Sequence, residues 1–177
     1  DVAEADATMT DIPEVPALLD SLEQSLRDTL SDRGVADPLL VGIRTGGVWI
    51  ARELHRRLGL EEPSGELDIS FYRDDFSRIG LNPRVTPSHL PFETEGRDLV
   101  LVDDVVMSGR TIRAAMNELF DYGRPSSITL VSLIDLGGRD LPIQPDVVAH
   151  RLALPPSQRI KLVGPDPLKI EVREVKA

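Results

Sequence analysis

The stretch LVLVDDVVMSGRT, residues 99–111, constrains the fold of this chain more than any other. Its first four residues are apolar, which is typical of a strand buried on both faces of a sheet. Two acids, Asp103 and Asp104, follow at once, and a turn of small and polar residues then leads into a helical pattern. Sheets built from such strands bind ligands at the carboxyl ends of the strands. The stretch therefore predicts a core strand that delivers two carboxylates to a ligand site.

Strands and helices alternate along the predicted chain. Apolar residues at helical spacing predict a helix that begins after Pro13 and ends at Gly34. The apolar stripe of that helix consists of Val15, Leu18, Leu19, Leu22, Leu26 and Leu30. Further helices are expected after RTGG and after SGRT, and strands are expected over 38–43, 65–72, 98–104 and 126–136. This alternation indicates βαβ units, and therefore a parallel central sheet flanked by helices.

The chain of 177 residues is long enough for one domain with a sizeable core. We expect a flexible N-terminal segment over residues 1–12 and a single domain over 13–177. Residues 73–97 lack a clear period and form an unusually long connection, which is typical of a lid over a functional site. The last forty residues contain short apolar pieces that predict small strands or a flap.

The composition excludes several classes of function. The absence of cysteine rules out disulfides, thiolate catalysis and Cys-ligated zinc, and it favours a cytoplasmic protein. There is no run of about 18 apolar residues, so no membrane span is expected. Since the net charge is −10, no basic stripe for nucleic acid is evident either.

The turn after the paired acids has the chemistry of a phosphate site. Its small residues let backbone N–H groups approach an anion, and the helix that follows adds unpaired donors and the positive end of its dipole. We assign this role to Met107, Ser108, Gly109, Arg110 and Thr111. Carboxylates beside a phosphate suit vicinal hydroxyls or a hard cation such as Mg²⁺. A phosphate, a diol and carboxylates together describe a ribose 5-phosphate.

The same stretch resembles the phosphoribosyl pyrophosphate motif of type I phosphoribosyltransferases. YRDD at 72–75, GRPSSI at 123–128 and GRDLPI at 138–143 extend the resemblance to the bacterial pyrimidine operon attenuation regulators that are also uracil phosphoribosyltransferases. The similarity covers roughly residues 35–150. It implies the type I phosphoribosyltransferase fold, with a hood or flap from the loop after the second strand and from the C-terminal segment. It also implies the conversion of uracil and phosphoribosyl pyrophosphate to UMP and pyrophosphate.

The resemblance assigns roles to residues at the other strand ends. It implies a pyrophosphate loop at Arg44, Thr45, Gly46 and Gly47, and a base site built from backbone groups at Ile134, Asp135 and Leu136. Asp103 and Asp104 become catalytic residues that hold Mg²⁺, through water or through the ribose hydroxyls. Arg73 is the further catalytic candidate, because it directly follows the second strand and can bring donors to pyrophosphate.

Two alternatives to a uracil enzyme stay open at this point. One is an RNA-binding attenuator that uses the nucleotide pocket as a sensor, and the other is a phosphoribosyltransferase for a purine or for orotate. The sequence argues against RNA binding, because residues 11–34 carry six acids and two arginines, and because Arg139 is the sole basic residue over 135–146. We also expect a homodimer or a higher homo-oligomer, on the ground that the apolar stripe of the N-terminal helix is exposed.

Overall fold

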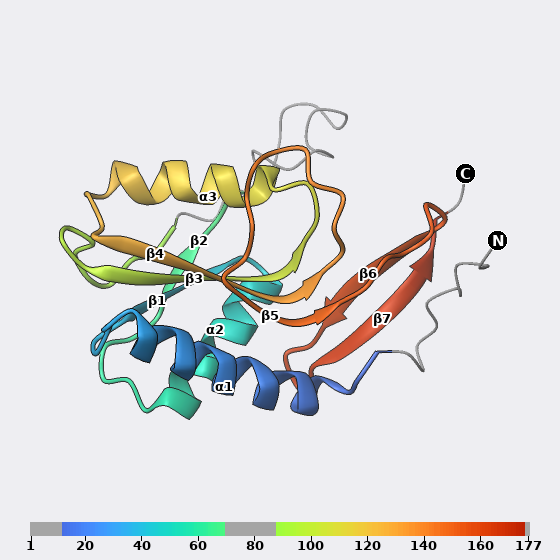
Figure 1. The fold of residues 1–177 in the computed structure, drawn as a ribbon, viewed down its shortest axis with the longest axis horizontal. Coiled ribbons are helices and arrows are strands. Elements are labelled where there is room, and N and C mark those ends of the chain that lie inside the picture. The colour runs from blue at the N-terminus through green and yellow to red at the C-terminus, as the bar shows by residue number, and fades with distance from the viewer. Residues whose placement is uncertain (1–11, 70–87, 176–177) are drawn as a thin grey trace.

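The computed structural model describes residues 12–69 and 88–175, which form an α/β fold around a five-stranded parallel sheet. The strands of the sheet lie in the order β2-β1-β3-β4-β5. Their bounds are Leu39–Ile43 for β1, Gly65–Leu67 for β2, Asp98–Val106 for β3, Ser127–Asp135 for β4 and Val147–Arg151 for β5. The prediction of a parallel sheet flanked by helices is confirmed (Figure 1).

Helices cover both faces of the sheet. The helices α1 (Val15–Asp32) and α2 (Gly46–Leu58) lie on one face, and α3 (Arg110–Asp121) lies on the other (Figure 1). Side chains of β3 therefore alternate between two cores: Val100 and Val102 pack with α1 and α2, whereas Leu99 and Leu101 pack with α3. Burial on both faces is the reason for the uninterrupted apolar run in the sequence.

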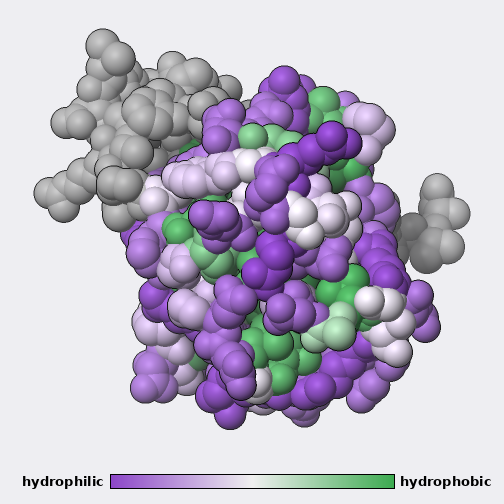
Figure 2. Space-filling model, turned by 90° about the vertical axis from the view of Figure 1, so that its left-hand side faces the viewer, coloured by the Kyte–Doolittle hydropathy of each residue, from purple (hydrophilic) through white to green (hydrophobic). Residues whose placement is uncertain are grey.

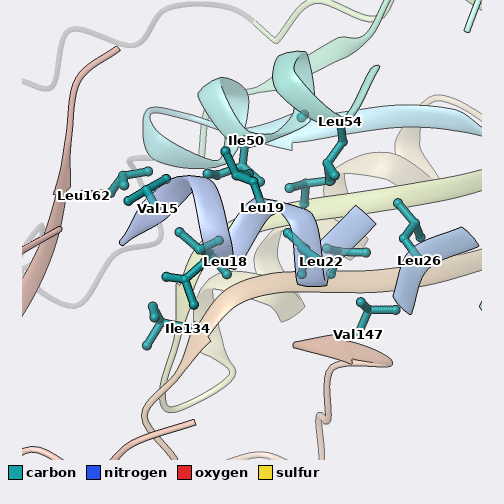
Figure 3. Close-up of a cluster of buried hydrophobic side chains, with 14 of the residues drawn as sticks. Val15, Leu18, Leu19, Leu22, Leu26, Ile50, Leu54, Ile134, Val147 and Leu162 are labelled. Atoms are coloured by element: carbon teal, nitrogen blue, oxygen red, sulfur yellow. The ribbon is translucent and has the colours of Figure 1, made fainter. Parts of the chain in front are cut away.

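The apolar stripe of α1 is buried in the chain's own core. All six of the predicted residues are buried, and Figure 3 shows Leu18 beside Ile134 and Leu26 beside Val147. The expectation that this stripe is exposed was therefore wrong, because α2, β4 and β5 already cover it. The homo-oligomer stays a prediction, but this helix no longer supports it.

The C-terminal segment forms an antiparallel hairpin of β6 (Gln158–Val163) and β7 (Lys169–Glu174). Leu162 and Ile170 of this hairpin are buried in the same core as α1, and Leu162 lies next to Val15 (Figure 3). The hairpin thus extends from the edge of the domain past the start of α1 (Figure 1). It is the C-terminal part of the predicted hood, whereas most of the predicted lid, residues 73–87, lies outside the described residues.

Two predicted strand ends were wrong. The second strand ends at Leu67 rather than at residue 72, because its partner β1 ends at Ile43, which pairs with Leu67. The strand β3 continues past its predicted end at Asp104 to Val106, because its ladder with β4 runs on to the pair Val106↔Asp135. Backbone pairing with a neighbouring strand therefore decides where each strand ends, and side-chain polarity does not.

The strand order creates a switch point between β1 and β3. The chain leaves β1 toward β2 on one side, and β3 lies on the other side of β1. In open α/β sheets the ligand crevice lies at the carboxyl ends of the two strands that meet in this way. The end of β1 at Ile43 and the end of β3 beyond Val102 therefore locate the site.

The strands begin and the helices end at the end of the molecule that lies opposite the predicted site. Its surface is mostly hydrophilic, with small hydrophobic areas (Figure 2). In the part of the chain that the structure describes, no helix is both long and apolar enough to cross a membrane.

We predict that Leu22→Ala lowers the free energy of unfolding by about 2 to 5 kcal/mol. Leu22 is 0% exposed at the centre of the α1 interface, so its truncation leaves a cavity that the sheet cannot fill. The measurement is urea denaturation followed by circular dichroism. Ser21→Ala, at an exposed position of the same helix, is the control and should leave the unfolding free energy nearly unchanged. Equal stability of the two variants would contradict the proposed packing of α1.

Candidate active site

The two acids of β3 occupy different environments. Asp103 is 2% exposed, whereas Asp104 is half-buried. Successive residues of a strand point to opposite faces, so the two carboxylates do not form one cluster. Each is anchored by the backbone: Asp103 Oδ1 accepts a hydrogen bond from the Asp104 N–H at 2.9 Å, and Asp104 Oδ1 accepts one from the Val105 N–H at 2.8 Å. Asp104 is therefore the acid with the better access to a ligand.

The start of α2 is pressed against these acids. A Cβ atom on Gly46 would lie 2.2 Å from Asp104 Oδ2, and one on Gly47 would lie 2.4 Å from the Val102 carbonyl oxygen. Both distances are far below van der Waals contact, so a side chain at Gly47 requires movement of the β3 backbone, and one at Gly46 requires movement of the Asp104 side chain. The sequence predicted these glycines as backbone donors to pyrophosphate. The structure adds a second reason for them, because they bring the predicted pyrophosphate loop against the predicted catalytic acid.

The N-termini of α2 and α3 both lack a side-chain cap. Neither Thr45 nor Gly109, the two N-cap residues, makes a side-chain cap hydrogen bond, and neither helix has an acid in its first turn. The first backbone bonds into these helices come from the Val48 N–H to Thr45 and from the Arg113 N–H to Gly109. The Arg110 N–H donates to the Ser108 hydroxyl, so the remaining donors for an anion are the amides of Gly46 and Gly47 in α2 and of Thr111 and Ile112 in α3, strengthened by the helix dipole.

The turn before α3 is held from one side by the segment after β4. Gly109 has φ of 93°, a conformation that residues with a side chain rarely adopt. The Ser108 carbonyl oxygen accepts hydrogen bonds from the N–H groups of Asp140 and Leu141, at 2.9 and 3.2 Å. The Ser108 hydroxyl in turn accepts one from the Arg110 N–H at 3.2 Å. The predicted phosphate turn thus has a defined backbone shape, with Thr111 half-buried in the first turn of α3.

The predicted base-binding residues lie beside the end of β3. Val106 pairs with Asp135, and the Leu136 N–H donates to the Val106 carbonyl oxygen at 3.0 Å. Other backbone groups here already have partners within the chain, since the Ile134 carbonyl accepts a bond from the Ser132 hydroxyl and the Asp135 carbonyl accepts one from Leu152. The Ile134 side chain is buried against α1 (Figure 3), so it faces the core rather than a ligand.

Asp135 is paired with an arginine of the following segment. Burial raises the pKa of its carboxyl, but hydrogen bonds from the Arg139 guanidinium and the Gly137 N–H outweigh burial and hold the pKa below its usual value. The Arg139 Nη2 donor lies 2.7 Å from Asp135 Oδ2. Sequence reasoning used Arg139 only within the GRDLPI resemblance and as the sole basic residue over 135–146. Its four-residue spacing from a buried acid was the signal that could have identified the pair.

Arg44 of the predicted pyrophosphate loop points to β2. Its Nη2 atom lies 2.5 Å from Glu66 Oε2, and the other oxygen of Glu66 binds Arg52 at 2.6 Å. The Arg44–Thr45 peptide bond is cis. Sequence reasoning missed Glu66, because nothing in the spacing of residues 44 and 66 shows that β1 and β2 are neighbours. The other catalytic candidate, Arg73, lies outside the described residues.

The donor set suits Mg²⁺ that arrives with a phosphorylated substrate. The described residues contain no group of three or more His, Cys, Asp or Glu side chains that could cage a metal. Mg²⁺ in phosphate-handling sites instead binds through one or two carboxylates, with substrate oxygens and water completing its shell. Asp104, half-buried beside the start of α2, fits that requirement, whereas the buried Asp103 points to the other face of β3.

Comparisons with known proteins agree with this geometry. Residues 8–151 match the family described as the phosphoribosyl transferase domain. The chain belongs to the phosphoribosyltransferase family. It is also 60% identical over 160 residues to the bifunctional protein PyrR of Pseudomonas paraeruginosa, a match that covers 90% of this chain and 94% of the relative. The PyrR protein of Pseudomonas savastanoi pv. phaseolicola is 56% identical over 164 residues, which cover 93% of this chain and 96% of the relative.

These relatives place the chain among the PyrR phosphoribosyltransferases and confirm the family that the sequence motifs predicted. A solved purine phosphoribosyltransferase from Pyrococcus horikoshii superposes with a TM-score of 0.58 at 24% identity, covering 78% of this chain and 82% of the other. At that identity the match supports the type I phosphoribosyltransferase fold and not the choice of base.

We predict that Gly46→Ala lowers the kcat/KM of the phosphoribosyltransferase reaction by about 100-fold, the scale of loss for a catalytic group displaced by about 1 Å. The new methyl group overlaps Asp104 Oδ2, so the carboxylate has to move. Fold stability should not fall, because alanine favours a helix over glycine. Activity is followed by pyrophosphate release.

Gly59→Ala, at the other end of α2, is the matched control. Gly59 has φ of 63° and open space around it, so alanine there costs stability through the backbone alone. The control should unfold at a lower temperature and keep its kcat/KM. Retained activity in Gly46→Ala would show that the contact with Asp104 is not needed for catalysis.

Proposed function

We propose that this protein transfers ribose 5-phosphate from phosphoribosyl pyrophosphate to uracil, giving UMP and pyrophosphate. The observation that carries the proposal is the pair of uncapped helix N-termini, on α2 and α3, with Asp104 beside the first of them. One substrate with two separate phosphate groups and a diol between them matches this arrangement. The similarity to PyrR proteins supports the choice of a pyrimidine.

The two anion sites take different parts of the substrate. The turn 107–111 and the start of α3 hold the 5-phosphate, which does not change during the reaction. The loop 44–47 and the start of α2 hold the pyrophosphate, whose charge grows as it leaves, so donors there stabilise the transition state. Asp104, beside Gly46, lies on the leaving-group side of the ribose and binds its hydroxyls or the hydrated metal.

The reaction is a displacement at ribose C1. The bond from C1 to the pyrophosphate oxygen breaks, the bond from uracil N1 to C1 forms, and the N1 proton is lost to solvent. Asp104 would hold Mg²⁺ together with substrate oxygens, and the metal would supply positive charge for the leaving pyrophosphate. The chain's own residues orient the two substrates, and the carboxylates of β3 stabilise the positive charge that develops on the ribose.

The absence of cysteine supports a cytoplasmic location for this activity.

The test is pyrophosphate release from phosphoribosyl pyrophosphate and Mg²⁺, with uracil, hypoxanthine, guanine and orotate compared side by side. We expect turnover with uracil and little with the other bases. Asp104→Asn is the control for the site, and it should lose about 1.5 to 3 kcal/mol of transition-state stabilisation, because a charged hydrogen bond is removed. Preference for hypoxanthine or guanine would show that the base is a purine and would contradict the choice of uracil.

We also propose that the protein does not bind a pyrimidine-operon leader RNA with regulatory affinity. Three arginines of residues 11–34 and 135–146, the two regions whose charge argues against RNA binding, are engaged within the chain. Arg27 pairs with Glu23 at 3.0 Å, Arg33 pairs with Asp146 at 2.6 Å, and Arg139 pairs with Asp135 at 2.7 Å. Phosphate contacts require cations that can face the RNA, and a net charge of −10 repels it.

A salt titration of leader-RNA binding, with and without UMP, checks this proposal. Specific nucleic-acid complexes usually have Kd values of about 10⁻⁸ to 10⁻¹¹ M. We expect only weak binding that UMP does not change. Sub-micromolar, UMP-dependent binding with a steep salt dependence would instead favour the alternative, an RNA-binding attenuator.

A further inference from the structure

The segment after β4 lies against the phosphate turn and has no role in the chemistry described above. We name residues 137–144 the strap. Besides the two hydrogen bonds from the strap to the Ser108 carbonyl, Ile143 packs where a Cβ atom on Gly109 would come within 3.3 Å of it. The strap therefore contacts the phosphate turn over consecutive residues of that turn.

Arg139 is the residue of the strap that connects it to two other parts of the site. Its Nη1 atom donates to the Met107 carbonyl at 2.8 Å, its Nε atom donates to the Ile143 carbonyl at 2.7 Å, and its Nη2 atom donates to Asp135. One planar guanidinium thus joins the first residue of the phosphate turn, the far end of the strap and the end of β4. The fixed fork of arginine donors suits three acceptors in this arrangement, whereas a lysine offers a single flexible charge.

The Asp135 carboxylate holds the guanidinium in place. Asp135 is 5% exposed on its side chain and Arg139 is 18% exposed, so the pair is largely shielded from water. The lowered pKa of the Asp135 carboxyl keeps this partner charged at neutral pH. A paired and shielded charge resists reorientation, because moving either partner leaves the other buried without compensation.

We infer that Arg139 is a positioning residue for the 5-phosphate turn. It fixes the Met107 carbonyl, so that the amides at the start of α3 face the phosphate in one orientation. The inference rests on the proposed function, since it concerns the phosphate site of that reaction. It also predicts a separation of effects, because the pyrophosphate loop at 44–47 has no contact with the strap among the hydrogen bonds of the described residues.

The experiment measures binding of two probes, ribose 5-phosphate and inorganic pyrophosphate, each with Mg²⁺, by isothermal titration calorimetry. The variant is Arg139→Lys, which keeps the charge beside Asp135 but cannot reach three acceptors at once. We expect ribose 5-phosphate to bind about tenfold more weakly, the factor for one lost charge-assisted hydrogen bond, and pyrophosphate binding to be unchanged. In turnover assays the KM for phosphoribosyl pyrophosphate should rise while kcat stays the same.

Arg33→Lys is the matched control. Arg33 also bridges two elements, through Thr129 at 2.8 Å and Asp146 at 2.6 Å, but Thr129 lies near the start of β4, away from the site. This variant should leave binding of both probes unchanged. If Arg139→Lys fails to fold, the double variant Arg139→Met with Asp135→Asn removes both charges together and should show the same selective loss.

The possible outcomes separate the two proposals. If the Arg139 variant binds both probes more weakly by the same factor, or binds both as tightly as the wild type does, the positioning role is overturned while the proposed function stands. If the wild-type protein binds neither probe, the proposed function is overturned, and the inference with it.

Discussion

The close approach of α2 to the end of β3 is the contact on which the site depends. No side chain separates Gly46 from Asp104, or Gly47 from the Val102 carbonyl. This contact brings the amides at the start of one helix next to the acid at the end of the neighbouring strand. The switch point between β1 and β3 makes such an approach available, because the two strands are adjacent and their following segments diverge. A substrate that carries both a phosphate and hydroxyls can then be held by donors and acceptors together.

Groups of opposite polarity surround this contact. The uncapped N-termini of α2 and α3 provide positive potential without lysine, and the acids of β3 provide negative potential within the same crevice. Arginines near the site are already paired with acids, as Arg44 is with Glu66 and Arg139 is with Asp135. Among the described residues, the donors that the proposed function uses are therefore backbone groups, whose geometry is set by the fold and does not require long side chains to be ordered when substrate binds.

Most of the fold could be predicted from the residues. The stripe of α1, the glycine that follows α1 and the apolar run of β3 each follow a local pattern, and the structure confirms the elements that they predict. The predicted ends of β2 and β3 were wrong, because the length of a strand depends on its partners. The exposure of the α1 stripe was also wrong, since a periodic apolar face does not reveal whether its own chain or a second copy covers it.

The sequence by itself determined which residue types meet at the candidate site: two acids at a strand end, a turn of small residues before a helix and a glycine-rich loop after an earlier strand. Only the tertiary structure decided which of these residues are accessible and which contacts hold them in place. It buries Asp103 and leaves Asp104 half-buried against Gly46, and it turns Arg139 inward to join Met107 to Asp135. The physical reason is that these contacts join residues far apart in sequence, and their distances follow from strand order and helix packing, which no local pattern contains.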